Sequence, residues 1–189
     1  PADRRYEIQA GNAEDNRYFM RRGQNTFETI SDSGGNDWIS ASGSELSATI
    51  DLEPLAPNFI GAGGNQWQTY LIAFGSEIEN GVGAKFADSI SGNRFDNVLI
   101  GNAGDDVLQG RAGFDHLYGG AGNDQYIYEI GDGRDVFNEE DEGGKDSVKL
   151  IGFDSFNSIE DLTFNRLGND LLIRLRLDGN TTHIDDSIL

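Results

Sequence analysis

The chain of 189 residues contains no cysteine, only two histidines, and only 14 Lys and Arg against 33 Asp and Glu, for a net charge of −19. The absence of cysteine excludes disulfides and thiolate metal sites, so oxygen ligands remain as the metal chemistry available to this chain. The shortage of basic residues argues against a nucleic-acid-binding surface, because no basic stripe could release phosphate counterions. No apolar run approaches the length of a transmembrane helix.

Catalytic motifs are also missing. His116 and His183 lie far apart in the sequence, and neither an HExxH pair nor a GxSxG elbow is present. His116 precedes a residue expected to point inward, so we expect it on the surface. In so acidic a chain, neighbouring carboxylates are better explained as solvated or metal-bound than as acid–base pairs. The sequence therefore predicts a domain that is not an enzyme, although it could belong to a larger secreted protease, lipase or polysaccharide-active enzyme.

Glycine and acidic residues are what the chain has in abundance, with 26 Gly and a mean hydropathy of −0.50. Low hydrophobicity combined with high net charge is typical of disordered chains. Bound divalent cations offer an alternative, because each Ca²⁺ offsets two carboxylates. The chain begins without Met and without a secretory leader, so we expect it to be a piece of a longer protein.

A period of nine residues runs through the middle of the chain. From Gly83 to Ile127 five blocks follow one another without a gap: GAKFADSIS, GNRFDNVLI, GNAGDDVLQ, GRAGFDHLY and GGAGNDQYI. Position 1 is always Gly, position 6 is Asp or Asn, and position 8 is Ile, Leu or Tyr. Three columns that keep their chemistry through five blocks indicate a repeating structural unit.

The three columns have a simple physical interpretation. Glycine reaches positive φ at no steric cost, so positions 1 to 6 are expected to form a turn. Positions 7 to 9 are expected to be extended, with the apolar position 8 pointing inward. Two blocks close one coil of 18 residues, and stacked coils lie about 4.8 Å apart. Since a calcium–oxygen bond is about 2.4 Å, Asp88 and Asp106 could share one ion between stacked turns.

Two other interpretations stay open. A flexible Gly/Asp linker explains the composition, but not the apolar column at position 8. A β-solenoid that stacks without metal explains that column, but it would stack like charges at the turns, where they repel each other.

The blocks resemble the RTX nonapeptide GGxGxDxUx, in which U is a large apolar residue. Upstream, TFETISDSGGNDWISASG (26–43), ATIDL (48–52) and EIENGVG (77–83) are similar to the C-terminal domain of serralysin metalloproteases. Downstream, GDGRDVF (131–137), GGKDSVKL (143–150), IEDLTFNRLGNDLLI (159–173) and HIDD (183–186) are similar to the segment that follows RTX repeats in haemolysin-type proteins.

The resemblance implies an all-β, right-handed parallel β-roll, or β-helix, capped at both ends by additional β-strands. It divides the chain into an N-terminal linker or first strand (1–24), a serralysin-like β-region (25–82), the RTX β-roll (83–137) and a C-terminal β cap (138–189). Within the cap we expect strands at Val148–Ile151, Leu162–Phe164 and Leu171–Leu175, with a hairpin turn at Leu167–Asp170.

The resemblance also implies calcium ligands, position by position. An ion takes the carbonyls of positions 2 and 4 and the side chain of position 6 from one block, and positions 1, 3 and 6 from the block two further on. One site would then use Ala84, Phe86, Asp88, Gly101, Ala103 and Asp106. A second would use Asn93, Phe95, Asn97, Gly110, Ala112 and Asp115, and a third Asn102, Gly104, Asp106, Gly119, Ala121 and Asp124. In the serralysin-like region further sites would use Asp32, Gly34 and Asp37, and Gly35, Asp37, Glu77 and Glu79.

Four departures from the repeat pattern bear on these sites. Phe86 and Phe95 replace the glycine of position 4, and Asn97 lowers the charge of the second site, which should weaken it. Arg111 stands where the repeat has glycine. After Ile127 the spacing lengthens to eleven residues, so the candidate ligands Asp135 and Asp146 fall outside the regular period.

Two functions follow as hypotheses. In the first, several Ca²⁺ ions fold the domain outside a Gram-negative bacterium, after export of the unfolded chain by a type I channel, and the domain supports a covalently attached catalytic or adhesive domain. Disorder in chelator and cooperative β-structure in calcium are then expected. In the second, the domain is secreted or lies on the cell surface as a calcium-dependent adhesin-type module that binds a glycan, a peptide or another copy. Trp38, Trp67, Tyr70 and Phe74 could line its groove, or they could fill the core instead.

Overall fold

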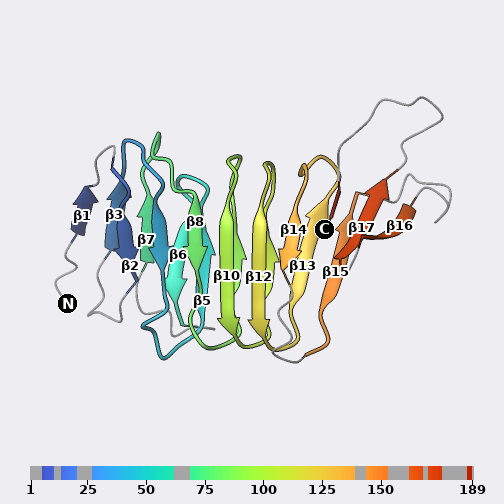
Figure 1. Cartoon of the computed structure of the whole chain (residues 1–189). Coiled ribbons are helices and arrows are strands. Elements are labelled where there is room, and N and C mark those ends of the chain that lie inside the picture. Colours follow the sequence, from blue (N-terminus) through green and yellow to red (C-terminus); the bar gives the residue numbers. More distant parts are fainter. Residues whose placement is uncertain are drawn as a thin grey trace.

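The computed structural model describes residues 6–10, 14–20, 27–61, 69–138, 144–152, 162–167, 170–175 and 187–188. All regular elements within these ranges are β-strands, and no helix there is long and apolar enough to cross a membrane. Parallel coils stack one on the next along the molecule, with the N-terminal strands at one end and the last repeats towards the other (Figure 1). The expected all-β roll of parallel coils is confirmed.

Two sheets form the walls of the roll. Sheet A contains, in spatial order, β1 (Tyr6–Ala10), β3 (Phe27–Ser31), β7 (Thr69–Ile72), β6 (Pro57–Ile60), β5 (Ala48–Asp51), β9 (Ser89–Ser91), β11 (Val107–Gln109), β13 (Gln125–Glu129) and β15 (Ser147–Ile151). Sheet B contains β14 (Val136–Asn138), β12 (His116–Ala121), β10 (Val98–Ala103), β8 (Asn80–Val82), β4 (Trp38–Ser40) and β2 (Arg17–Phe19).

Successive nonapeptides alternate between the two walls. The strands of the first, third and fifth blocks are β9, β11 and β13 in sheet A, while β10 and β12 of the second and fourth blocks lie in sheet B. In sheet A Val107 pairs with Ser89, and in sheet B His116 pairs with Val98, a register of 18 residues in both. Two blocks therefore close one coil, as the sequence predicts.

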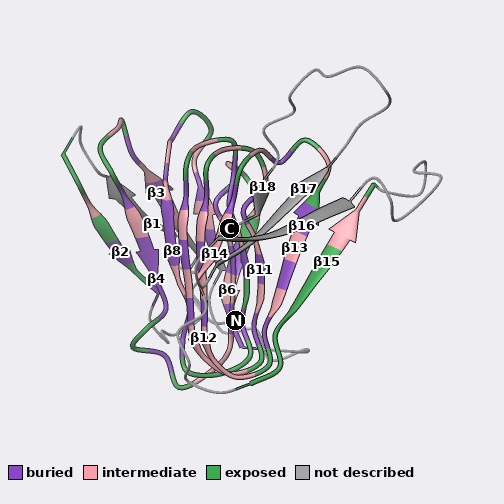
Figure 2. Ribbon diagram, turned by 45° about the vertical axis from the view of Figure 1, so that its right-hand side comes forward, coloured by how far each residue is buried: buried purple, intermediate pink, exposed green. Residues whose placement is uncertain are grey.

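The position-8 column forms the core. Ile90, Leu99, Leu108, Leu117 and Tyr126 are all at most 1% exposed, while positions 7 and 9 beside them are half-buried or exposed. Figure 2 shows this alternation of buried and half-buried residues along the repeat strands. Burial of one such side chain contributes about 1.5–3 kcal/mol. Short strands of three residues can stack in this way because each contributes one inward side chain to a continuous column.

The N-terminal region adds an antiparallel insertion to sheet A. β6 pairs antiparallel with both β5 and β7, whereas β7 then pairs in parallel with β3. Ile60 and Tyr70 of this insertion are at most 1% exposed, so the insertion extends the same core. β5 in turn pairs in parallel with β9 and joins this region to the first nonapeptide coil.

The core of the roll ends in aromatic side chains. Tyr126 stacks on Phe137 with ring centroids 4.7 Å apart, and beyond them Val148 of β15 is 39% exposed. A third sheet follows, in which β16 (Leu162–Leu167), β17 (Asp170–Leu175) and β18 (Ser187–Ile188) pair antiparallel. Leu167 pairs with Asp170, which confirms the hairpin expected from the sequence.

Candidate metal centre

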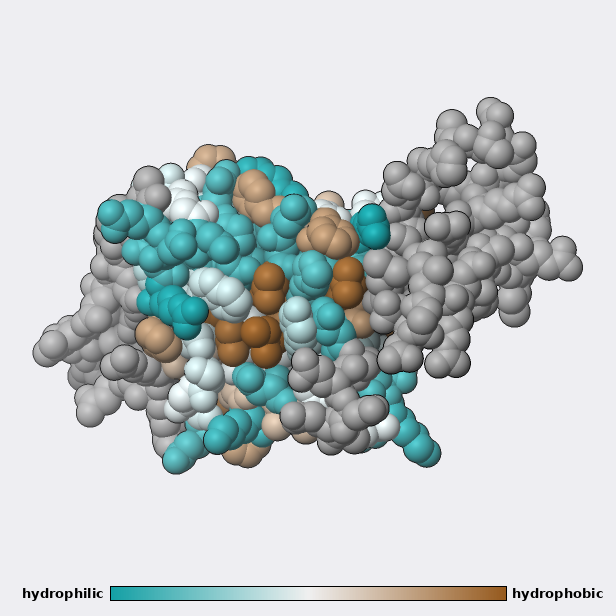
Figure 3. Space-filling model, in the orientation of Figure 1, coloured by the Kyte–Doolittle hydropathy of each residue, from teal (hydrophilic) through white to brown (hydrophobic). Residues whose placement is uncertain are grey.

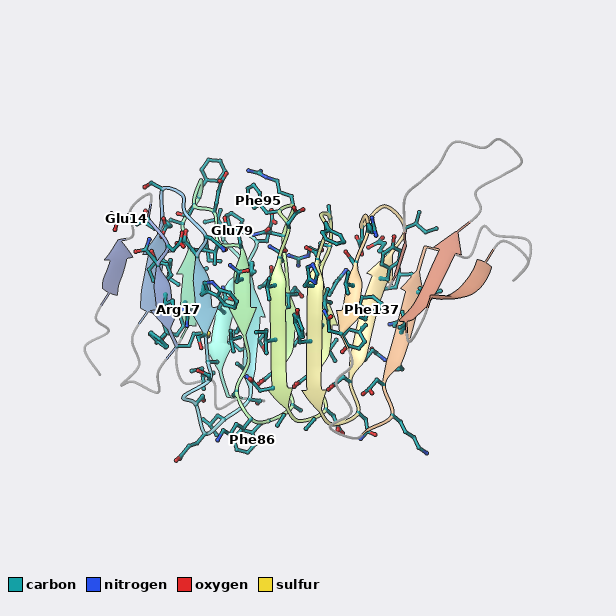
Figure 4. The ribbon with its side chains drawn as sticks, in the orientation of Figure 1. Glu14, Arg17, Glu79, Phe86, Phe95 and Phe137 are labelled. Atoms are coloured by element: carbon teal, nitrogen blue, oxygen red, sulfur yellow. The ribbon has the colours of Figure 1, made fainter. Side chains whose placement is uncertain are left out.

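The turns of the roll line up along its two edges. Turns 83–88, 101–106 and 119–124 lead from sheet B to sheet A and form the first edge. Turns 92–97, 110–115 and 130–135 lead back to sheet B and form the second edge. Phe86 and Phe95 project from opposite edges and make the two rows of turns easy to find (Figure 4). Position-6 side chains of alternate blocks therefore stack above one another.

Each stacked position-6 carboxylate uses one oxygen to bind the neighbouring coil. On the first edge the Asp88 N–H donates to Asp106 Oδ1 at 2.7 Å, and the Asp106 N–H donates to Asp124 Oδ1 at 2.8 Å. On the second edge the Asn97 N–H donates to Asp115 Oδ1 at 2.7 Å. These hydrogen bonds fix the carboxylates in rows along the edges.

The other oxygen of several of these carboxylates has no partner. Among the described residues, the buried side-chain oxygens without a hydrogen-bond partner are Oδ2 of Asp37, Asp106, Asp115, Asp124 and Asp135. Leaving such an acceptor buried and unpaired costs about 1–3 kcal/mol, and more when it is charged. A cation at each of these oxygens would remove that cost, so the residues present fit the calcium ions that the sequence implies.

Backbone carbonyls converge on the same points. A Cβ atom placed on Gly101 would lie 2.5 Å from Gly119 O and would collide with Asp106 Oδ2. One coil earlier, Gly101 O and Asp88 Oδ2 both approach Gly83, but there Asp88 Oδ2 already accepts a hydrogen bond from the Ala84 N–H. Glycine at position 1 therefore leaves room for a carboxylate and a carbonyl that face one another. Two acceptors cannot bond to each other, whereas Ca²⁺ binds both kinds of oxygen.

Burial changes the acidity of these groups. Loss of solvation raises the pKa of Asp106 and of Asp115 to about 7, and that of Asp135 to about 8, with repulsion from Asp115 adding to the effect at Asp135. It raises the pKa of Asp88 to about 6. The charged carboxylate is thus disfavoured in the absence of a cation, although these aspartates are the groups that stacking brings together.

The structure brings together the turns that the sequence assigns to each of the three repeat sites. Turn 83–88 stacks on 101–106, turn 92–97 on 110–115, and turn 101–106 on 119–124. No group of three or more His, Cys, Asp or Glu side chains close enough to hold a metal occurs in the described ranges. The carboxylates alone would therefore not complete the coordination of an ion at these turns, and the resemblance implies that backbone carbonyls complete it.

The N-terminal candidates lie on the second edge. The Asp37 N–H donates to Glu79 Oε2 at 2.8 Å, and Asp37 is fully buried. Asp32 instead accepts hydrogen bonds from the Tyr18 hydroxyl and from the backbone N–H of Ser33 and Gly34.

The carboxylates of this region differ in the partners they already have. Glu77 lies 3.4 Å from the guanidinium of Arg94 in an exposed ion pair, and Asp32 is bound by hydrogen-bond donors. Asp37, whose Oδ2 is buried and unpaired, is therefore better placed for a metal than Asp32 and Glu77. Gly34 and Gly35, with φ of 126° and 131°, shape the turn that carries Asp37.

Asp135 and Asp146 extend the two rows in spite of the longer spacing. The Asp115 N–H donates to Asp135 Oδ1 at 3.3 Å on the second edge, and the Asp124 N–H donates to Asp146 Oδ1 at 2.9 Å on the first. Asp135 is fully buried, whereas Asp146 is exposed. The extra residues lengthen the turns, so the register of the strands is kept.

A second row of hydrogen bonds, at position 5, was not predicted from the sequence. Here the later coil donates: Asn123 N–H to Asp105 Oδ1 at 2.9 Å, and Phe114 N–H to Asp96 Oδ1 at 2.8 Å. Position 5 of the five blocks holds Ala87, Asp96, Asp105, Phe114 and Asn123, so no regular column indicated this row. The exposed Asp105 has its pKa lowered by the Asn123 hydrogen bonds, so this row bonds neighbouring turns without requiring a cation.

The aromatic residues considered for a groove do not gather in one place. Tyr70 is 1% exposed and fills the core, one of the two places that the sequence left open for it, whereas Phe74 is 87% exposed on a turn. Trp38 is half-buried on the outer face of sheet B, with the Arg17 guanidinium 5.4 Å from its ring centroid. Trp67 lies outside the described residues.

Comparison with known families agrees with this geometry. The family model described as the RTX calcium-binding nonapeptide repeat (4 copies) matches residues 22–44, 82–113 and 100–136. These ranges include the turns that carry Asp37, Asp88, Asp106, Asp115, Asp124 and Asp135. A comparison with curated proteins found no match.

Proposed function

Because the chain is an RTX calcium-binding domain, we propose that it functions by folding when calcium binds between its repeat coils. In this proposal the domain belongs to a secreted protein of a Gram-negative bacterium and folds outside the cell. One observation carries the proposal: the unpaired, buried Oδ2 atoms of stacked position-6 carboxylates. Without a cation they oppose stacking, and with one they join neighbouring coils. Calcium thereby becomes part of the free energy of folding.

The calcium concentration of the surroundings then decides the state of the chain. Extracellular calcium modules bind with affinities of about 10⁻⁴–10⁻³ M, so their sites fill outside the cell and stay empty in the cytosol. An incompletely folded chain suits export through a type I channel, and ordering after export would give an attached catalytic or adhesive domain a rigid neighbour. The domain itself supplies no catalytic group in this proposal.

Circular dichroism during a calcium titration tests the proposal. The protein in EGTA should gain β-structure cooperatively as free calcium rises through the millimolar range, and magnesium at the same concentration should not replace it, because it demands tighter octahedral geometry. Identical spectra in EGTA and in calcium would refute the proposal. The double variant Asp106→Ala/Asp124→Ala should need more calcium, while Asp105→Asn, which removes a charge at the exposed neighbouring position but keeps its acceptor oxygen, serves as the control.

The outer face of sheet B favours a second candidate function, calcium-dependent recognition of a glycan or peptide. No acidic residue lies on the outward positions of β2, β4, β8, β10, β12 and β14, which carry among others Trp38, Val98, Ile100 and Tyr118. Figure 3 shows apolar surface gathered over the middle of β8 and β10, between hydrophilic margins. Glycan and peptide arrays with and without calcium test this candidate. Binding that Trp38→Ala and Tyr118→Ala abolish would support it, and blank arrays would exclude it.

A further inference from the structure

The five nonapeptide turns fall into two classes by the backbone conformation of position 2. In the third and fourth turns this position has positive φ even without glycine, at 80° for Asn102 and 67° for Arg111, and Gly120 of the fifth turn has φ of 98°. Ala84 and Asn93, at position 2 of the first two turns, do not have positive φ. The peptide between positions 1 and 2 is therefore turned differently in turns 83–88 and 92–97, which we call the closed turns, and in turns 101–106, 110–115 and 119–124, the open turns.

In the closed turns, the backbone N–H of position 2 donates a hydrogen bond to a side-chain oxygen of position 6. The equivalent oxygen has no partner in the open turns. The Ala84 N–H donates to Asp88 Oδ2 at 2.5 Å, and the Asn93 N–H donates to Asn97 Oδ1 at 2.8 Å. The Asn97 amide also donates to Glu79 O at 2.8 Å and to Asn93 Oδ1 at 3.1 Å. In the open turns the corresponding Oδ2 of Asp106, Asp115 and Asp124 has no partner.

The position-1 carbonyl differs between the classes as well. In the closed turns it points to the following turn and is bonded: Gly83 O accepts from Asn102 Nδ2 at 2.9 Å, and Gly92 O accepts from Arg111 Nη1 at 2.5 Å. The Arg111 guanidinium also binds both carboxylate oxygens of Asp51, at 2.7 and 2.8 Å. In the open turns it points back at the preceding turn, as Gly119 O does at Gly101.

The sequence explains why these two turns differ. At position 4 the open turns have Gly104, Gly113 and Gly122, with φ of 121°, 143° and 146°. The closed turns have Phe86 and Phe95 there, and a bulky residue strongly avoids positive φ. The turns with phenylalanine thus keep the other peptide orientation and satisfy their position-6 side chains from their own backbone.

We propose that the closed turns 83–88 and 92–97 form a joint bonded without calcium, which serves as the template on which the calcium-dependent coils from 101 onward stack. The proposal rests on the proposed function and deepens it by assigning which turns calcium orders. In the closed turns, the N–H groups of position 2 and the Asn97 amide supply the hydrogen-bond donors that the open turns lack.

Amide hydrogen exchange during a calcium titration of the wild-type protein tests the template. The Ala84 and Asn93 amides, which close the turns, should become protected at lower free calcium than the Asp106 and Asp115 amides, which join the open turns. Equal or reversed midpoints would overturn the joint and leave the proposed function intact. If all four amides were equally protected from exchange with and without calcium, both the proposed function and the joint would be overturned.

The variant Asn97→Asp tests the closing hydrogen bonds directly. A carboxylate cannot donate to Glu79 O or to Asn93 Oδ1, so the urea midpoint in EGTA should shift down relative to wild type. Gln125→Glu, which adds the same charge at an outward position of β13, should leave that midpoint almost unchanged. Equal midpoints for Asn97→Asp and Gln125→Glu would show that the Asn97 amide does not hold the turn closed.

Discussion

The substitution Asp106→Asn should reverse its effect on stability when calcium is added. Asp106 Oδ1 accepts the Asp88 N–H, and an asparagine Oδ1 can accept the same bond. Its Oδ2, by contrast, is buried and unpaired beside Gly119 O. An asparagine Nδ2 at that place becomes a donor that faces the Gly119 carbonyl.

The expected magnitudes follow from these contacts. Without calcium, the substitution pairs an unsatisfied buried acceptor, which is a gain of about 1–3 kcal/mol. It also removes a carboxyl group whose pKa burial raises to about 7, so the gain should be larger at pH 8 than at pH 5. With calcium, one charged ligand is lost, and an affinity on the order of tenfold weaker corresponds to about 1.4 kcal/mol per ion.

Urea unfolding followed by circular dichroism at pH 8 measures both effects. In EGTA the Asp106→Asn protein should retain more β-structure than wild type, whereas in millimolar calcium its urea midpoint should lie below that of wild type. Asp105→Asn makes the same chemical change at the exposed neighbouring position, where the side chain already accepts a hydrogen bond, and it should show no reversal. Destabilisation of Asp106→Asn under both conditions would refute the interpretation that the unpaired Oδ2 of Asp106 is a cation ligand.

Three further predictions concern the core, the position-1 glycines and pH. Leu108→Ala removes a fully buried member of the position-8 column and should cost about 2–5 kcal/mol in urea unfolding with calcium present; a loss below 1 kcal/mol would mean that the column is not the core. Gly101→Ala places a Cβ 2.5 Å from Gly119 O and should cost about 1–3 kcal/mol, whereas Gly43→Ala, with open space around it, should be nearly neutral. The position-6 carboxylates with pKa raised to about 7 or 8 bind protons more tightly in the folded than in the unfolded chain, so the calcium-free form should be most stable near pH 4 and lose stability as pH rises towards 8. Calcium must displace these protons, so its apparent affinity should increase over the same range; an affinity independent of pH between 5.5 and 8 would contradict the raised pKa values.

The sequence alone was sufficient to predict the roll, because three of its columns repeat without a gap. Glycine at position 1, Asp or Asn at position 6 and an apolar residue at position 8 give the turns, the stacked carboxylates and the core that the structure shows. Leu162–Leu167 and Asp170–Leu175 likewise form the expected hairpin. In each case the property that decides the structure is local and repeats at a fixed spacing.

What the sequence did not predict depends on partners far along the chain. Arg111 looks like a plain departure from glycine, but it binds Asp51, the last residue of β5, sixty residues away. The pairing of β6 between β5 and β7 also has no periodic signature. The lengthened spacing after Ile127 placed Asp135 outside the regular period, whereas longer turns absorb the extra residues and keep Asp135 in line with Asp115.

The closed turns favour one order in which the coils of the roll stack. β5 pairs with β9 of the first closed coil, and the Ala48 N–H donates to Asp88 Oδ1 at 2.5 Å, so backbone bonds tie this coil to the N-terminal region on the first edge. On its other side every open turn brings a buried carboxylate that neither its own backbone nor the next coil fully satisfies. A coil without a stacked neighbour costs little free energy where hydrogen bonds satisfy its polar groups. It costs much more where buried charges face each other without a partner. Ordering that starts at the closed coil therefore adds one calcium-dependent coil at a time towards the C-terminus, whereas ordering from the opposite end would have to assemble the uncompensated carboxylates first.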